Sequence, residues 1–261
     1  MDKPAPAQRK RAVPAVTRAI AILRRLGGSD EPLGVQQIAR DLGLVPSTCL
    51  HILRVLKDEG LVAFDPVSKR YFIDVGILSI ARSAIEKNPF ASLIQPKLDD
   101  LAKSFGLTAI AVKLVEPTSM VVVALSQVPL PFRLQVDLGS RFPALISATG
   151  RCFAAFNTPD EAMLRKGFAA LNWDNPPEFA TWREEVRQAR EQGYAVDRGN
   201  YISGVTVVAV PFFDDRNRMN HGMVVIGISE RVATIGVPAL AREMLAVRDE
   251  VAPMLMGKPG G

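Results

Sequence analysis

The stretch that decides the fold is residues 34–60, GVQQIARDLGLVPSTCLHILRVLKDEG, which predicts two short helices around a turn at Gly43. Each helix repeats apolar side chains three or four residues apart, so each has one apolar face. Gly43 suits the left-handed backbone that ends a helix, and Pro46 suits the first turn of the next helix. The two apolar faces consist of Val35, Ile38, Ala39 and Leu42, and of Cys49, Ile52, Leu53 and Leu56.

The second of these helices carries side chains suited to reading DNA. A recognition helix needs hydrogen-bonding groups for base edges in its N-terminal half and cationic groups for phosphates behind them. These residues alone fit an ordinary helical hairpin with a solvated face equally well, and the flanking sequence favours DNA binding. The outward positions are Ser47, Thr48, Leu50, His51, Arg54 and Lys57.

The flanking segments complete a winged helix-turn-helix. Periodic apolar residues predict a further helix at about 15–26. Short β-prone runs at 61–64 and 70–73 surround the turn-forming sequence DPVSK, which predicts a hairpin. Lys69 and Arg70 in this wing are expected to contact the DNA backbone or the minor groove.

The chain is expected to divide into four parts. Residues 1–13 form a flexible basic tail, which fits either a DNA-contacting arm or a solvated terminus. Residues 14–75 form the winged helix-turn-helix domain, and residues 76–88 form a linker helix. Residues 89–258 form a second domain.

Composition and charge agree with a DNA-binding protein. The 261 residues are enough for two domains, and 48% hydrophobic residues are enough for a sizeable core. The absence of an export signal and of a long apolar run, together with only two cysteines, predicts a cytoplasmic protein with no membrane partner. The whole excess of +5 lies in residues 1–88, with 14 Lys+Arg against 9 Asp+Glu. This uneven distribution of charge indicates a surface that attracts DNA phosphates, and chance is the alternative explanation.

The second half alternates elements in an α+β manner. Pro96 is expected to interrupt a helical region at about 91–105. Strands without a repeated βαβ pattern favour one antiparallel sheet with helices on its faces. The strands are predicted at 108–115, 119–126, 132–138, 194–197, 205–211 and 222–229, with a loop at 139–148 and helices at about 149–156, 160–166, 178–192 and 238–256.

Taken in order, several stretches of the chain resemble the IclR family of bacterial transcriptional regulators. The resemblance covers nearly the whole chain. It implies a winged-helix DNA-binding domain and a GAF-like effector domain that binds a small organic molecule. It also implies dimers or dimers of dimers on palindromic operator DNA, acting as repressors or activators. The stretches are TRAIAILRRL, IARDLGLVPSTCLHILRVLKDEGLV, YFIDVG, GSRFPALISATG, EQGYAVDRGNYISGVTVVAVPFFD and VVIGIS.

The resemblance also implies site residues. Ser47, Thr48, His51 and Arg54 match DNA contacts, although the family commonly has Arg in place of His51. His51 can donate a hydrogen bond, but it cannot form the bidentate fork of Arg with guanine.

The effector pocket implied by the resemblance lies at the turn into the helix at 149–156. Ala148, Thr149 and Gly150 match this turn, where a helix N-terminus offers free N–H groups to a carboxylate. Asp197 matches an acidic pocket position. Apolar residues replace the usual polar ones, so an aromatic or otherwise hydrophobic acid is the expected effector. These apolar positions are Val207, Val224 and Ile226, with Leu145, Met120 and Phe132 as further candidate lining.

An enzyme acting on a small organic acid through the second domain is the main alternative. His221 is the only histidine there, and no nucleophile, metal, phosphate-loop or dinucleotide motif is present, so no cofactor is expected. Asp214-Asp215 fits a polar turn better than a catalytic pair. Cys152 fits a small buried residue better than a redox sensor. Arg133 and Arg141 fit either carboxylate anchors or surface charges.

Overall fold

The computed structural model describes residues 13–86, 88–115, 119–129, 136–157 and 159–256. The chain divides into two compact units, Met1–Lys87 and Asn88–Gly261. Nearly all of the predicted tail therefore lies outside the described residues, as do Phe132, Arg133 and most of the strand expected at 132–138. No helix among the described residues is both long and apolar enough to cross a membrane.

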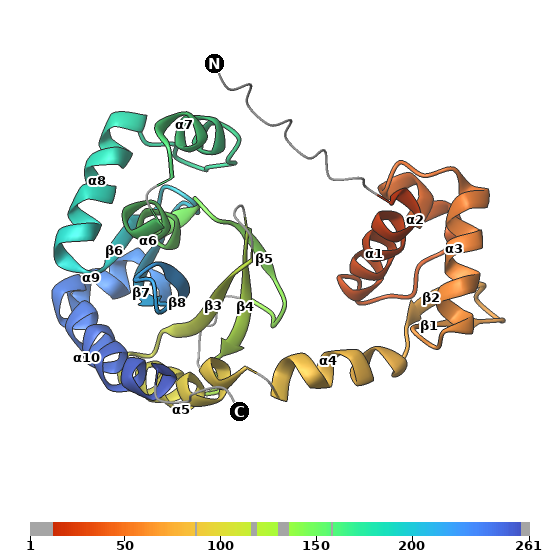
Figure 1. Ribbon diagram of the computed structural model, residues 1–261, viewed down its shortest axis with the longest axis horizontal. Helices are drawn as coiled ribbons and strands as arrows, with labels where there is room; N and C mark the ends of the chain where they lie inside the picture. Colours follow the sequence, from red (N-terminus) through yellow and green to blue (C-terminus); the bar gives the residue numbers. More distant parts are fainter. Residues whose placement is uncertain (1–12, 87, 116–118, 130–135, 158, 257–261) are drawn as a thin grey trace, which may run out of the picture. The chain divides into compact units, whose positions relative to one another are not determined.

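The first unit is a winged helix-turn-helix, as the sequence predicts (Figure 1). Gly43 has a φ of +62°, and Pro46 opens the recognition helix. The apolar faces of the first three helices meet in one buried cluster that includes Ile22, Ile38 and Leu53. The elements are α1 (Pro14–Gly27), α2 (Val35–Asp41), α3 (Pro46–Asp58), β1 (Val62–Asp65), β2 (Arg70–Ile73) and α4 (Gly76–Glu86).

The wing is an antiparallel hairpin of β1 and β2, in which Val62 pairs with Ile73 and Asp65 with Arg70. The Asp65 carboxylate accepts hydrogen bonds from the N–H groups of Val67 and Ser68 and from the Ser68 hydroxyl. The hydroxyl bond from Ser68 contributes most to lowering the pKa of Asp65, followed by the backbone bond from Val67. A charged carboxylate thus closes the turn.

The second unit is one six-stranded sheet in the order β5-β4-β3-β8-β7-β6, with antiparallel neighbours throughout. The mixed α+β class is confirmed. The strands are β3 (Thr108–Val115), β4 (Ser119–Leu125), β5 (Arg141–Pro143), β6 (Ala195–Arg198), β7 (Val205–Phe213) and β8 (Met219–Ile228).

Helices cover both faces of this sheet (Figure 1). One face packs against α6 (Ser147–Asn157), α7 (Glu161–Ala169) and α8 (Phe179–Gln192). The other packs against α5 (Pro89–Phe105), α9 (Ser229–Ile235) and α10 (Val237–Met256). Because strand side chains alternate between faces, Val207 and Ala209 join the first cluster and Val208 and Val210 join the second.

Some boundaries differ from the sequence predictions. The expected interruption at Pro96 is wrong, because α5 runs without a break from Pro89 to Phe105. Its buried residues Ile94 and Leu98 lie on either side of the proline on one face, and their packing offsets the lost hydrogen bond. The three-residue β5 and the seven-residue α9 were not predicted, because such short segments carry little periodicity.

Candidate DNA-reading helix and apolar cavity

One face of α3 is buried in the core, and the other is exposed to solvent. Cys49, Leu53 and Leu56 are buried, whereas Ser47, His51, Arg54, Lys57 and the wing residue Lys69 are exposed. Ser47, His51 and Arg54 are four and three residues apart, which places them along one stripe of the helix. Among the described residues, Arg54 and Lys57 make no ion pair, so both charges are available to a phosphate.

The remaining predicted DNA contacts are partly engaged within the protein. Thr48 is half-buried, and Leu50 packs against the edge of the core. Arg70 is exposed, but its guanidinium donates to the carbonyl oxygen of Pro32 at 3.2 Å. The N–H groups of Ser47 and Thr48 lie in the first turn of α3, where a helix has donors without partners and favours an anion.

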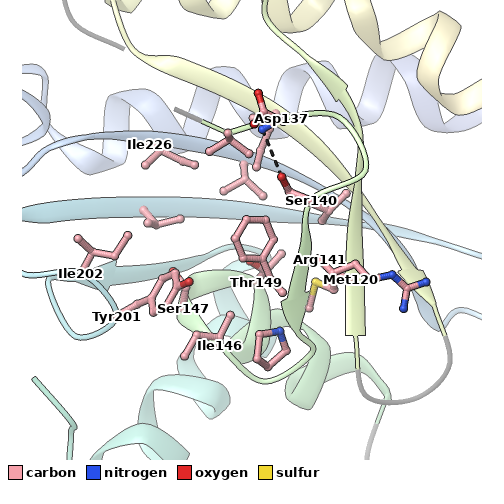
Figure 2. A pocket seen from close by; sticks show the side chains of 17 residues that line it. Met120, Asp137, Ser140, Arg141, Ile146, Ser147, Thr149, Tyr201, Ile202 and Ile226 are labelled. Atoms are coloured by element: carbon pink, nitrogen blue, oxygen red, sulfur yellow. Dashed lines mark hydrogen bonds between the residues drawn. The ribbon is translucent and has the colours of Figure 1, made fainter. Parts of the chain in front are cut away.

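A cavity of about 450 Å³ lies between the sheet and the start of α6, and we call it the α6 cavity (Figure 2). Strand side chains form its floor, the turn into α6 forms one wall, and the loop after β6 forms another. Most of its lining is apolar. The lining residues are Ile110, Val112, Met120, Val136, Asp137, Ser140, Arg141, Phe142, Pro143, Ile146, Ser147, Thr149, Tyr201, Ile202, Val207, Val224 and Ile226.

Half of the ten residues that the sequence placed in an effector site line this cavity, namely Met120, Thr149, Val207, Val224 and Ile226, and Phe132 lies outside the described residues. The other four lie elsewhere. Ala148 is fully buried in the core. Leu145 lines a separate apolar cavity of about 250 Å³ between the 143–145 segment and α7. Gly150 lies in the first turn of α6, and Asp197 is buried in β6.

Gly150 is required by packing. A Cβ at this position would lie 2.0 Å from both the carbonyl carbon and the carbonyl oxygen of Leu145. Its N–H donates to the carbonyl oxygen of Ile146 at 2.8 Å. The tight turn into α6 therefore needs a residue without a side chain here.

Asp197 is buried and forms an ion pair with Arg151, which sequence reasoning missed. Arg151 is 0% exposed and its guanidinium lies 3.1 Å from the Asp197 carboxylate. The same carboxylate accepts hydrogen bonds from the N–H groups of Asn200 and Tyr201. An arginine in a helix usually lies on the surface, and no local pattern in the sequence marks Arg151 as buried.

Ser147 presents a polar group to the α6 cavity, and the sequence reasoning also missed it. Its residue is 4% exposed, and its hydroxyl has no hydrogen-bond partner among the described residues. Its φ of +57° is unusual for a residue other than glycine. The residue opens α6, so the hydroxyl and the first-turn N–H groups lie at the positive end of the helix dipole.

Two cavity residues, Tyr201 and Ile202, come from the loop that follows β6. Burial and, secondarily, the nearby Asp174 carboxylate raise the pKa of Tyr201, so its phenol keeps its proton. Arg141 lines the opening, and its guanidinium points away from the other labelled side chains in Figure 2. No periodic pattern marks these loop residues in the sequence.

The groups considered for chemistry lie apart from this cavity. His221 packs on the opposite sheet face against Phe90, with ring centroids 4.2 Å apart. Burial raises the pKa of Cys152 to about 12, so this thiol lacks the thiolate character of a redox sensor. Asp214 accepts hydrogen bonds from the N–H groups of Arg216 and Arg218, in the turn between β7 and β8.

Comparisons with known proteins agree with this architecture. A sequence model described as "Bacterial transcriptional regulator IclR C-terminal" matches residues 82–252, and one described as "IclR helix-turn-helix domain" matches residues 15–66. The glycerol operon regulatory protein of Streptomyces griseus is 32% identical over 241 residues, covering 92% of this chain and 94% of the relative.

A second relative is the HTH-type transcriptional repressor AllR of Escherichia coli strain K12, 26% identical and covering 84% of this chain and 81% of its own. Among solved structures, the crystal structure of an IclR transcriptional regulator from Alicyclobacillus acidocaldarius matches with a TM-score of 0.81 at 26% identity. It covers 93% of this chain and 98% of that one.

The fold and these matches define a DNA-binding regulator of transcription rather than an enzyme. The chain belongs to the IclR family, which confirms the resemblance found in the sequence.

Proposed function

We propose that this transcriptional regulator binds a palindromic operator as a dimer or dimer of dimers in the cytoplasm, and that it senses a small aromatic or hydrophobic organic acid in the α6 cavity. The observation that carries the proposal is the cavity itself. Its floor is apolar, and the hydroxyl of Ser147, which has no hydrogen-bond partner in the described part of the chain, faces it at a helix N-terminus. An apolar ligand with one acceptor group matches that combination.

The charged side chains of the lining, Arg141 and the exposed Asp137, leave the helix end as the place for an acid group. Among the described lining residues, Arg141 is the only cation, and its guanidinium points away. The nearby Arg151 is engaged by Glu185, Asp197, Asn200 and the carbonyl oxygen of Ser147. A ligand carboxylate is therefore left with the Ser147 hydroxyl and the first N–H groups of α6.

The name of the Streptomyces relative suggests glycerol metabolism as a second candidate. The lining argues against a polyol, because Val207, Val224 and Ile226 offer no hydrogen bonds to hydroxyl groups. Unpaired polar groups in an apolar site would cost free energy on binding. Glycerol therefore belongs in the experiment as a competing outcome.

Solvent-exposed apolar side chains on the first unit support the proposed oligomer. Val16 and Ile20 on α1 are 56% and 42% exposed, and Leu78 and Ile80 on α4 are 63% and 61% exposed. Covering such residues in a dimer removes them from water. Two α3 helices then enter major grooves about 34 Å apart, with the α4 linkers fixing the separation.

An effector shifts DNA binding by the difference between its affinities for two arrangements of the dimer, typically about 1–3 kcal/mol.

The experiment is an anisotropy titration of the full chain against DNA upstream of its own gene. It is repeated with benzoate, phenylacetate, pyruvate, glyoxylate and glycerol. An aromatic acid that changes operator affinity supports the proposal, and Val224→Ser should alter that response while leaving operator binding intact. A response limited to glycerol or to the two- and three-carbon keto acids would overturn the effector class.

A further inference from the structure

One buried side chain, Arg151, connects the two walls of the α6 cavity. One terminal nitrogen (Nη1) donates to the carbonyl oxygen of Ser147 at 3.0 Å and to Asp197 at 3.1 Å. The other (Nη2) donates to the side-chain oxygen of Asn200 at 2.8 Å. Its Nε donates to Glu185 on α8 at 2.7 Å. The guanidinium thus reaches both α6 and the loop after β6.

Two of these contacts, Ser147 and Asn200, lie at or next to a residue that lines the cavity. Ser147 lines one wall, and Tyr201, adjacent to Asn200, lines the other (Figure 2). Arg151 itself lies behind the lining, and its own charge does not enter the cavity. Its position fits a residue that holds other residues in place.

Hydrogen bonds hold the loop at 199–204 on two sides. Gly199 and Gly204 flank it with φ values of +79° and +75°. Its outer side is held by the 174–175 segment, where the Asn175 N–H donates to the Asn200 carbonyl at 2.9 Å and the Ser203 N–H to Asp174 at 2.8 Å. Its inner side is held through Asp197 and Arg151.

We propose that Arg151 is a positioning residue: it holds the 199–204 loop against the start of α6 and so sets the opening of the α6 cavity. The inference rests on the proposed function, in that the cavity is taken as the effector site. It adds that the affinity for an effector depends on a residue that does not touch it.

A buried ion pair alone does not account for an arginine here. Buried pairs often add little stability, and a lysine also pairs with one carboxylate. What arginine adds is a planar fork whose separate nitrogens bond acceptors in different directions. In this fold those acceptors are the carbonyl oxygen of Ser147 and the side-chain oxygen of Asn200, one on each of the two walls.

The experiment compares three variants of the full chain by amide hydrogen exchange, with no small molecule present. Arg151→Lys keeps a charge for Asp197 but has one terminal nitrogen, so it cannot keep both the Nη1 bonds to Ser147 and Asp197 and the Nη2 bond to Asn200. Asn200→Ala removes the acceptor on the loop and, with it, the side-chain N–H that donates to the carbonyl oxygen of Asn175 at 3.1 Å. Glu185→Ala is the matched control, because it removes the contact with α8 and leaves both walls connected.

We expect exchange at the N–H groups of residues 200, 201 and 203 to become roughly tenfold faster in Arg151→Lys and Asn200→Ala, the scale of one lost hydrogen bond to a charged group. Glu185→Ala should match the parent protein. Acrylamide quenching of Trp173, beside the 174–175 segment, should rise in the first two variants, while the buried Trp182 serves as an internal reference.

Unchanged exchange in Arg151→Lys and Asn200→Ala would overturn the proposal, as would equal loosening in Glu185→Ala. If Arg151→Lys fails to fold, a comparison of Asn200→Ala with Asn200→Asp decides, because both lose the bond to Asn175 and only Asn200→Asp keeps an acceptor for Arg151. If no organic acid binds the protein, the proposed function is wrong. The exchange experiment still tests the role of Arg151, because it uses no small molecule.

Discussion

His221 is expected to make the second unit acid-sensitive. Burial, and secondarily the positive charge of Lys113, lowers the pKa of His221 from 6.5 to about 4. Its Nδ1 lies 2.9 Å from the side-chain oxygen of Asn220, and its Nε2 has no partner among the described residues. The folded state therefore holds this imidazole neutral.

Proton binding at His221 makes the folded protein less stable at low pH. Between pH 6.5 and about 4 the unfolded chain binds a proton at His221 that the folded chain does not, so stability is complete above this window and falls as pH falls through it. The full difference is about 3 kcal/mol, and about 2 kcal/mol of it is lost by pH 5.

The assay is urea unfolding at pH 7.5 and pH 5.0, followed by tryptophan fluorescence. Both tryptophans, Trp173 and Trp182, lie in the same unit as His221, so the signal reports that unit. His221→Phe preserves a ring against Phe90 and removes the titration. We expect the parent protein to lose about 2 kcal/mol more than the variant between the two pH values. Equal losses would refute the reasoning, because they would mean that the folded protein accepts the proton.

Three further predictions concern the other unit, the turn into α6 and the thiols. Arg54→Ala should weaken operator binding roughly tenfold to a hundredfold without changing thermal stability, because the side chain is exposed and has no ion pair within the described part of the chain; normal operator affinity in anisotropy would show that the DNA-reading face is assigned wrongly. Gly150→Ala should destabilise the second unit by about 2–3 kcal/mol in urea unfolding, because the new Cβ meets the Leu145 carbonyl; an unchanged midpoint would contradict the packing argument. Both thiols, Cys49 and Cys152, should resist a thiol reagent at pH 8 until urea is added, because burial raises the pKa of each; rapid labelling of the folded protein would count against this.

The first unit was predictable because its signals are local. The periodicity around Leu53, the left-handed turn at Gly43 and the proline at the start of α3 all act within a few residues. The sheet was predictable in outline for the same reason, since apolar runs of strand length mark β3, β7 and β8. Strand order depends on contacts between distant residues and did not follow from these signals.

The cavity was only partly predictable. Val207, Val224 and Ile226 lie on strands, where alternation indicates which side chains share a face. Arg151 looks like a surface residue in its own helix, and its burial depends on Asp197 and Asn200 far along the chain. The positive φ of Ser147 arises from the tight packing of this turn, which no local pattern records.

The pairing of β3 with β8 in the middle of the sheet has a consequence for how the protein is made. Thr108 pairs with Ile226, so the central ladder joins residues from opposite ends of the second unit. A ribosome must release nearly the whole chain before this ladder closes, whereas the first unit is complete by residue 87 and rests on short-range contacts. The DNA-reading unit is therefore expected to fold during translation, roughly 7–28 seconds before the end of β8 at Ile228 is made, at about 5–20 residues per second.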